Sequence, residues 1–281
     1  MSQKFINRAC HYSTRSHLFF SVKKIILVKI ILVILFFHGC AFLSTKQNSQ
    51  FFLTVDDVET IIQNVKEQEY IVSEFYSTGT LRVPAWILDT SLDIFIAGKK
   101  TPLTFKMEIS HSWGKPLYYF LIKEDTLEIR DFIEKKQYTG KLTPDNLARF
   151  IPNMDCSPDM IWSFLRGYPQ LLSYSRVYEV APGVLSIEGR NKNTLGKIIV
   201  SPGNEIKEAE SSPPRFLNMR FTDFRQIEEI NYAEKTVLEE IKGKRDLTLK
   251  RKKVIFNKNI PDAIFTLKNQ PVFEVVSLDD L

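Results

Sequence analysis

The chain has 281 residues, of which 44% are hydrophobic and 25% are charged, and its 38 Lys and Arg residues outnumber 33 Asp and Glu residues for a net charge of +5. Residues 1–39 hold six of these basic residues and no acidic one, so the remaining 242 residues carry 32 basic and 33 acidic residues. This near-neutral body gives no electrostatic reason for a nucleic-acid partner. Its length suits one large β domain or two small ones.

A charged and then apolar segment near the N-terminus is typical of a bacterial lipoprotein signal peptide. Lys23 and Lys24 precede an apolar run from Ile25 to Phe37 that is interrupted only by Lys29, and Gly39 and Cys40 follow it. We expect cleavage before Cys40 and acylation of its thiol. The predicted organisation is therefore a signal peptide at 1–39, an acylated tether at 40–50 and one domain at 51–281.

Two alternatives exist for this segment. Phe37 and His38 depart from the Leu-(Ala/Ser) pair that usually precedes Gly-Cys in such signals. An uncleaved transmembrane anchor would span roughly 20 Å, short of the roughly 30 Å hydrocarbon core, and it would place Lys29 inside the membrane. A soluble N-terminus is the other alternative. Translation from Val22 rather than Met1 would give a more compact signal.

Cysteine and histidine are too scarce for the common metal and nucleophile sites. Beyond Cys40 only Cys156 and His111 remain, so an internal disulfide and a three-ligand His/Cys zinc site are both excluded for residues 41–281. The sequence Gly98-Lys99-Lys100 lacks the leading glycine and the Ser or Thr of a phosphate loop. We predict no cofactor, no metal and no enzyme, with a carboxylate-only hydrolase as the enzyme alternative.

The predicted elements of the domain begin with a helix. Thr54 can cap it, Asp57 stands three residues on, and apolar residues then recur at helical spacing. The stripe consists of Val55, Val58, Ile61, Ile62 and Val65. A helix of this pattern packs its one apolar face against the rest of the domain.

Strands come next. Alternation of apolar and polar residues over 103–110 predicts a strand with one buried face, and further short strands are predicted at 92–96, at 117–122 and around 127–130. Thr143-Pro144 and Ser157-Pro158 each predict a helix start, and Gly167 with Pro169 predicts the end of the second of these helices. Later strands are predicted at 177–180, 184–187, 197–200, 216–221, 227–232 and 247–256.

These elements predict an α+β fold that is mostly β. Ten to twelve strands and about three helices favour one large antiparallel sheet that curls into an incomplete β-barrel and is lidded by the helices.

Three stretches of the sequence resemble the LolA/LolB superfamily of periplasmic lipoprotein carriers and outer-membrane lipoprotein receptors. They are FKMEISHSWGKPLYYFLIKEDTLEIRDFIEKKQYTG, LTPDNLARFIPNMDCSPDMIWSFLRGYPQ and IPDAIFTLKNQPVFEVVSL, within about residues 51–275. The resemblance implies a curled, incomplete barrel whose apolar cavity holds acyl chains. Because the LolB-like receptors are themselves lipoproteins, Cys40 points to that branch.

The resemblance also implies a hairpin loop that enters the bilayer. The matching loop runs from Ser110 to Pro116, with Trp113 at the apolar position and Gly114 beside it. Tryptophan favours membrane interfaces because its ring is apolar while its N–H stays hydrated. The alternatives are a tryptophan that folds back over a sheet edge and one that is merely part of a solvated turn.

Two further groups of residues are candidates for a site. The lipid cavity would be lined by Phe105, Met107, Phe120, Phe216 and Phe221, although the same residues would also fill an ordinary core. A basic run could face anionic headgroups or an acidic carrier, or could be a solvated hairpin. Its members are Lys242, Lys244, Arg245, Lys250, Arg251, Lys252 and Lys253.

The sequence therefore predicts a lipid-anchored, periplasm-facing protein of the outer membrane that binds acyl chains and assists lipoprotein or lipid delivery. Ala41 rather than Asp after the acylated cysteine favours the outer membrane. Expected partners are the membrane, the acyl chains of a lipoprotein or lipid, and a periplasmic lipoprotein carrier. The alternative is a structural or assembly-factor lipoprotein of the same fold with a filled core.

Overall fold

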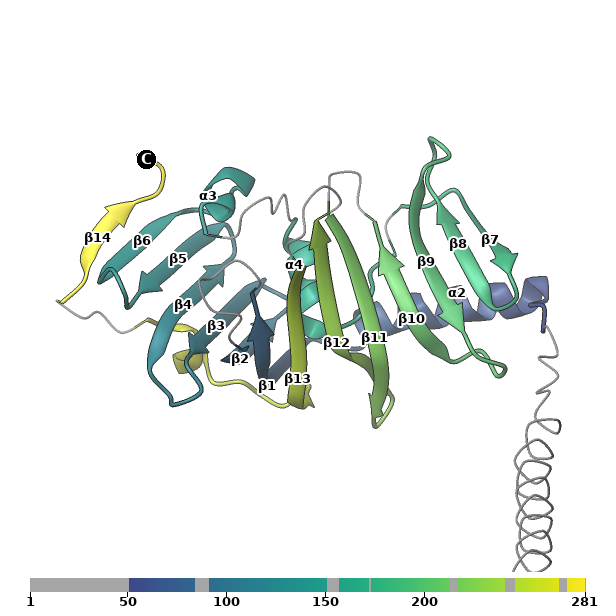
Figure 1. Cartoon of the computed structure of the whole chain (residues 1–281), viewed down its shortest axis with the longest axis horizontal. Coiled ribbons are helices and arrows are strands. Elements are labelled where there is room, and N and C mark those ends of the chain that lie inside the picture. Colours follow the sequence, from purple (N-terminus) through teal and green to yellow (C-terminus); the bar gives the residue numbers. More distant parts are fainter. Residues whose placement is uncertain are drawn as a thin grey trace, which may run out of the picture. The chain divides into compact units, whose positions relative to one another are not determined.

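The computed structural model describes residues 51–83, 91–150, 157–171, 173–212, 217–240, 246–267 and 272–280. In these residues fourteen strands form a single sheet (Figure 1). The strands are β1 (Glu74–Arg82), β2 (Ser91–Lys99), β3 (Thr104–Ser110), β4 (Pro116–Lys123), β5 (Thr126–Asp131), β6 (Lys136–Lys141), β7 (Arg176–Ala181), β8 (Val184–Glu188), β9 (Thr194–Val200), β10 (Ile206–Ser211), β11 (Leu217–Ile227), β12 (Ile230–Glu240), β13 (Asp246–Phe256) and β14 (Glu274–Ser277). The helices are α2 (Val55–Tyr70), α3 (Pro144–Ala148), α4 (Pro158–Arg166) and the 3-10 helix η1 (Asp262–Phe265).

The sheet has the order β14-β6-β5-β4-β3-β2-β1-β13-β12-β11-β10-β9-β8-β7. It curls without closing, because β14 and β7 are its two edges, and this confirms the predicted α+β incomplete barrel. The predicted ten to twelve strands are too few, since the described residues alone contain fourteen. One pairing also departs from the antiparallel expectation, because β14 runs parallel to β6.

The helix starts follow the predicted local signals. Thr54 and Asp57 form a capping box at α2, and the stripe residues Ile61, Ile62 and Val65 are buried. The structure corrects the first residue of the stripe, because the side chain of Val55 is 75% exposed. It lies in the first turn of α2. Ser157 likewise caps α4 through its hydroxyl.

Some strands differ from the predicted ones. The segment predicted as a strand at 227–232 contains the tight turn between β11 and β12, where Glu228 has a φ of 56°. Hydrophobic periodicity does not predict β1, β6, β10 or β14. In β1 the inward position Ser77 is polar although it is only 2% exposed, and β10 carries alternating charges. Pairing with neighbouring strands overrides these weak local preferences.

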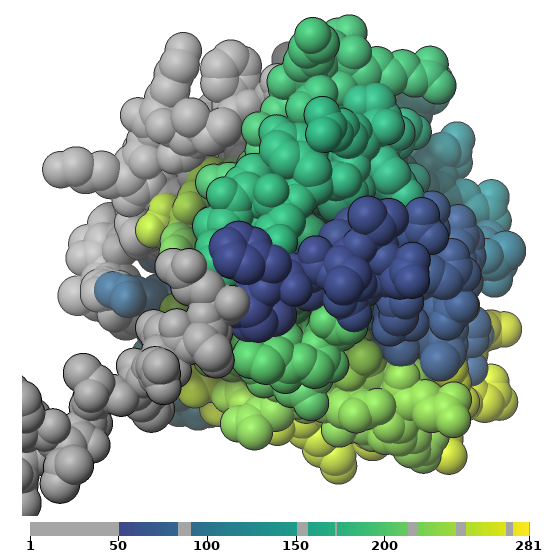
Figure 2. Space-filling view, turned by 90° about the vertical axis from the view of Figure 1, so that its right-hand side faces the viewer, coloured from purple at the N-terminus to yellow at the C-terminus, as the bar shows by residue number. Residues whose placement is uncertain are grey.

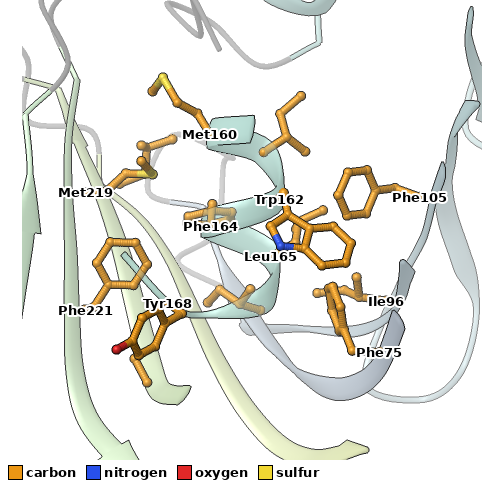
Figure 3. Packing of buried hydrophobic residues seen from close by; sticks show 14 of the residues in the cluster. Phe75, Ile96, Phe105, Met160, Trp162, Phe164, Leu165, Tyr168, Met219 and Phe221 are labelled. Atoms are coloured by element: carbon orange, nitrogen blue, oxygen red, sulfur yellow. The ribbon is translucent and has the colours of Figure 1, made fainter. Parts of the chain in front are cut away.

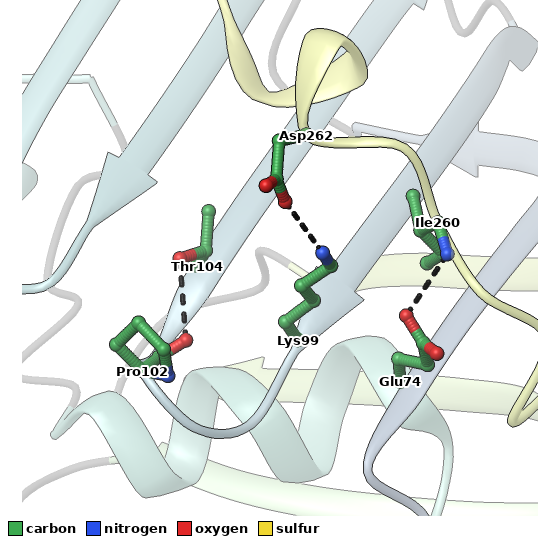
Figure 4. A network of polar contacts seen from close by, with 6 residues as sticks. All are labelled: Glu74, Lys99, Pro102, Thr104, Ile260 and Asp262. Carbon is green, nitrogen blue, oxygen red and sulfur yellow. Dashed lines mark hydrogen bonds and ion pairs between the residues drawn. The ribbon is translucent and has the colours of Figure 1, made fainter.

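The two faces of the sheet carry separate apolar clusters. The large cluster lies on the face that carries α4, which we call the inner face, and it includes the stripe of α2. A small cluster on the outer face joins Ala97, Leu121, Ile260 and Phe265 beneath the chain around η1. Polar contacts hold this chain in place, with Asp262 on Lys99 at 2.7 Å and the Glu74 carboxylate accepting from the N–H of Ile260 at 3.0 Å (Figure 4). The outer face is thereby partly covered.

Residues 51–281 form one compact unit. None of the helices in the part of the chain that the structure describes is long and apolar enough to cross a membrane.

Candidate functional site

Helix α4 lies between the two halves of the curled sheet (Figure 3). The Trp162 ring packs edge-on against Phe75 with ring centroids 5.3 Å apart, and against Phe105 at 5.5 Å. On its other side α4 faces Met219 and Phe221 of β11 (Figure 3). Every side chain from Met160 to Arg166 is buried, so α4 is enclosed all round rather than laid on a surface.

The predicted cavity-lining residues all belong to this inner face where the structure describes them. Phe105 is 1% exposed, Phe120 is 5% and Phe221 is 0% exposed. Met107 is 9% exposed, and Phe216 lies outside the described residues. A side chain that faced an open cavity would show accessible surface. Their lining role therefore stays a prediction, and it requires α4 to vacate the space that it fills.

Arg251 holds the C-terminal end of α4. Its guanidinium donates from Nη2 to the carbonyl oxygens of Leu165, at 2.9 Å, and of Phe164, and from Nη1 to the carbonyl of Ala233 at 3.0 Å and to Thr236 Oγ1 at 2.8 Å. The side chain is 2% exposed, so this member of the basic run contacts neither solvent nor a partner. Its donors satisfy carbonyls that a helix end leaves without intrahelical partners.

Arg251 faces inward in regular alternation with Leu249, and a β-bulge follows it. Between β1 and β13 the pairing steps from Thr78 with Lys253 to Gly79 with Arg251, so Lys252 is the extra residue. The strands approach very closely at this point, because a Cβ on Gly79 would meet a carbonyl oxygen of β13 at 2.2 Å. Lys252 and Lys253 are therefore both exposed, while Arg251 before them is buried against α4.

The charge of Arg251 is compensated mainly by peptide dipoles. Burial, together with the neighbouring positive charge of Arg166, lowers the pKa of Arg251 to about 9. The guanidinium is still protonated at neutral pH. It lies at the helix terminus where the partial charge is negative, which favours a cation there. This arrangement stabilises α4 in place through backbone carbonyls and the Thr236 hydroxyl as the acceptors of Arg251.

The C-terminal end of α2 is joined to the end of α4. Arg166 Nη2 donates to the carbonyl of Gln68 at 2.7 Å, and the Glu69 carboxylate accepts from the N–H of Leu171. Lys100 Nζ donates to the Glu69 carbonyl at 2.8 Å. Burial raises the pKa of Glu69, while the hydrogen bond from Leu171 opposes the shift. Displacement of α4 would break this joint as well as the contacts of Arg251.

An open groove of about 1070 Å³ lies beside α2. It is lined by α2, by the β9–β10 turn and by parts of β11, β12 and β13, and Figure 2 shows α2 lying across this side of the domain. Ile206 and Phe224 contribute apolar surface to it, while Ile61 and Tyr168 at its wall are almost fully buried. Tyr168 follows α4 in the chain and packs on Phe224 at 6.1 Å, so the groove adjoins the end of α4.

Charged side chains of both signs line the groove. Glu234 lies 3.3 Å from Arg225 and 3.5 Å from Lys250, and Glu205 lies 2.9 Å from Lys207. With Asp223, which also lines the groove, three acidic side chains balance three basic ones, so the groove is close to electroneutral. It therefore suits a zwitterionic or peptide-like group better than a strongly charged one. Sequence periodicity does not reveal this groove, because its walls come from elements far apart in the chain.

The Ser110–Pro116 loop is a tight turn with an exposed tip. The N–H of Gly114 donates to the His111 carbonyl at 2.8 Å, and Gly114 has a φ of 84°. Trp113 is 72% exposed, and its ring stacks on His111 with centroids 4.1 Å apart. Trp113 is thus exposed enough to contact a membrane. Insertion into a bilayer remains a prediction.

Other predicted residues fall outside the described residues. These are Cys40 and the first part of the basic run, Lys242, Lys244 and Arg245. Lys250, Lys252 and Lys253 are exposed on β13. Within the described ranges no group of three His, Cys, Asp or Glu side chains is arranged to hold a metal ion.

Comparison with known proteins finds similar folds only among solved structures. No protein-family model matches the sequence, and no curated protein matches it. A LolA superfamily protein from Nitrosomonas europaea is 17% identical with a TM-score of 0.48, over 74% of this chain and 97% of that one. A DUF1329 family protein from Desulfovibrio piger is 11% identical with a TM-score of 0.48, over 75% and 96%. The Mycobacterium tuberculosis lipoprotein LppX is 11% identical with a TM-score of 0.32, over 74% and 99%.

Proposed function

We propose that this protein binds acyl chains on the inner face of its curled sheet and assists delivery of lipoprotein or lipid to the membrane. In this proposal it is tethered through acylated Cys40 to the outer membrane and faces the periplasm, and no covalent chemistry is involved. The observation that carries the proposal is α4, a short helix enclosed on all sides by apolar walls from both halves of an open sheet.

An acyl chain can offset the cost of displacing α4. Each methylene removed from water contributes about 0.8 kcal/mol, so a chain of roughly 15 methylenes contributes about 12 kcal/mol. Displacing α4 exposes the apolar walls and breaks the contacts of Arg251 and Arg166, but the acyl chain covers the same walls again. The buried apolar side chains that α4 itself would expose cost about 1.5–3 kcal/mol each, a total similar to the gain from the acyl chain.

The groove beside α2 supplies the polar part of the proposed site. It begins at Tyr168, immediately after α4, and its paired charges suit the headgroup or peptide portion of an acylated ligand. Acyl chains would enter between α2 and the end of α4 while the polar portion stays in the groove. A periplasmic carrier is the proposed donor of the ligand.

Native extraction tests ligand binding directly. The protein is extracted from its own membrane without lipid exchange and analysed by mass spectrometry for co-purifying lipid or lipopeptide. We expect a stoichiometric acylated species. A protein that is consistently free of acyl chains under conditions that retain bound lipid in a known lipid carrier would contradict the proposal.

Delivery is tested at Trp113. Trp113→Glu should leave thermal unfolding nearly unchanged, since the side chain is 72% exposed. It should strongly reduce transfer of a labelled lipoprotein to liposomes, because a charge resists entry into hydrocarbon. Lys115→Ala in the same loop is the control and should have little effect. Full transfer by a folded Trp113→Glu protein would show that the loop does not insert.

The near-complete burial of Phe105 and Phe221 favours a second candidate function. A core that stays filled would suit a structural or assembly-factor lipoprotein of the same fold. The two candidates differ in whether acyl chains reach Trp162.

A further inference from the structure

Three large apolar side chains protrude from one end of the sheet. Trp113 is 72% exposed, Ile133 is 61% exposed and Val272 is 66% exposed. They lie in three separate connections, namely the β3–β4 turn, the β5–β6 turn and the segment that enters β14. Only Trp113 has a role in the function proposed above.

Strand pairing places the three connections at the same end. The N–H of Phe132, directly after β5, donates to the Leu117 carbonyl at the start of β4 at 3.0 Å, so the β5–β6 turn adjoins the β3–β4 turn. β14 runs parallel to β6, and the N–H of Glu274 donates to the Lys135 carbonyl at 3.0 Å. Val272 therefore lies beside the β5–β6 turn.

A ring contact joins the chain neighbours of Ile133 and Val272. Phe132 and Phe273 meet edge to face with centroids 5.3 Å apart, and the Arg130 guanidinium lies 5.0 Å from the centre of the Phe273 ring. Ile133 follows Phe132 and Val272 precedes Phe273 in the chain. The exposed pair thus stands on a packed aromatic base.

The charges around these tips favour an anionic surface. Lys115 stands two residues after Trp113, and Lys135 stands two residues after Ile133. Lys136 is 3.4 Å from Glu134, which leaves Lys115 and Lys135 against Glu274 for a net charge of +1 at this end. Apolar tips followed by lysines are typical of segments that dip into a bilayer while the ammonium groups meet the headgroups.

We propose that this end of the sheet docks on a membrane, with Ile133 and Val272 in contact with an anionic bilayer next to Trp113. We call this end, formed by the three connections, the docking edge. This inference rests on the proposed function and deepens it. A single inserted tryptophan leaves the domain free to tilt, whereas two separate contacts along the end of the sheet fix its orientation. The docked orientation would present the same face of the domain to the membrane at each delivery.

Spin-label depth measurement on the full-length acylated protein tests the docking edge. Cys156→Ser removes the other thiol, and Ile133→Cys, Val272→Cys or Val180→Cys then carries one nitroxide. Val180 on edge strand β7 is the control, being exposed but in the other half of the sheet. The protein is reconstituted into vesicles of phosphatidylethanolamine and phosphatidylglycerol, and collisions with oxygen and with a nickel chelate are compared.

We expect the ratio of oxygen to nickel collisions to rise severalfold at positions 133 and 272 relative to position 180. The rise should shrink in vesicles without anionic lipid. Ratios at 133 and 272 equal to that at 180 would overturn the docking edge, whether these side chains face water or another protein. Mass spectrometry for bound acyl chains on the same samples reports separately on the proposed function.

Discussion

Gly167 combines two constraints at the point where α4 ends. Its φ of 83° lies in the left-handed region that favours glycine, and its N–H donates to the Ser163 carbonyl at 2.9 Å. Its carbonyl accepts from the N–H of Ala233 at 2.6 Å, which joins the helix end to β12. A Cβ here would meet Cζ of Arg251 at 2.6 Å. Backbone conformation and packing thus both require glycine.

Gly114 provides a matched control for this position. It has a nearly identical φ of 84°, but nothing lies within 4 Å of a Cβ built on it. Gly114→Ala should cost only the conformational penalty of about 1–2 kcal/mol. Gly167→Ala should cost clearly more, because it also pushes Arg251 out of its contacts. Chemical denaturation of the two variants measures the difference, and equal losses would show that the crowding at α4 is relieved without cost.

The titration of Glu69, at the contact between α2 and α4, makes the stability of the protein depend on pH. Burial raises its pKa above the ordinary 4.5, so the folded state binds its proton more tightly than the unfolded chain does. The resulting stability is fully present below the unfolded pKa and is lost as the pH rises through the folded pKa. Glu69→Gln keeps an acceptor for Leu171 without this titration.

We therefore expect Glu69→Gln to gain stability relative to the unmodified protein as the pH rises from acidic to neutral. Melting temperatures of both proteins across that range measure the trend. A constant difference between them would mean that Glu69 titrates normally in the folded state.

At the scale of elements, α4 is stabilised by long-range contacts as much as by its own sequence. Arg251 supplies donors to Phe164 and Leu165, while β12 binds the glycine that ends the helix. Arg251→Met would leave these carbonyls without a charged donor inside the domain. We expect a loss of about 3 kcal/mol, since breaking buried charged hydrogen bonds costs a few kcal/mol.

Lys250→Met is the control on the same strand, because Lys250 is exposed and its ion pair with Glu234 contributes little. Denaturation measures both variants, and hydrogen exchange of the α4 amides should accelerate in Arg251→Met alone. Unchanged exchange in α4 would show that apolar packing by itself holds the helix.

The elements also show what sequence patterns can and cannot predict. The starts at Thr54 and Ser157 and the end at Gly167 are predictable because capping depends on residues within a few positions. Alternation with Leu249 places Arg251 on the inner face, but its contacts with the end of α4 are not predictable, because the two elements are distant in sequence. In isolation Arg251 looks like one more member of a solvated basic run. The groove beside α2 escapes prediction for the same reason.

At the scale of the whole domain, the sheet is curled but open, so its inner face must be covered by helices rather than by further strands. α2 and α4 cover it here, and α4 occupies the space between the two halves. The fold therefore provides a large apolar surface whose centre is covered by one short helix, α4. A groove with paired charges adjoins the cover, and exposed apolar tips lie at one end of the sheet. Together these features suit a protein that moves acyl chains between water and membrane.

The emission of Trp162 during titration with an acyl-chain ligand tests the central claim most directly. In a variant with Trp86→Phe and Trp113→Phe, Trp162 is the sole tryptophan, and on α4 it lies against Phe75 and Phe105 of the inner face. We predict a saturable red shift of this emission with a monomeric, water-soluble acyl ligand, because α4 carries Trp162 out of the apolar interior when the chain enters. Emission that stays unchanged at ligand concentrations that saturate a known acyl-chain binder would contradict the account and favour the filled-core alternative.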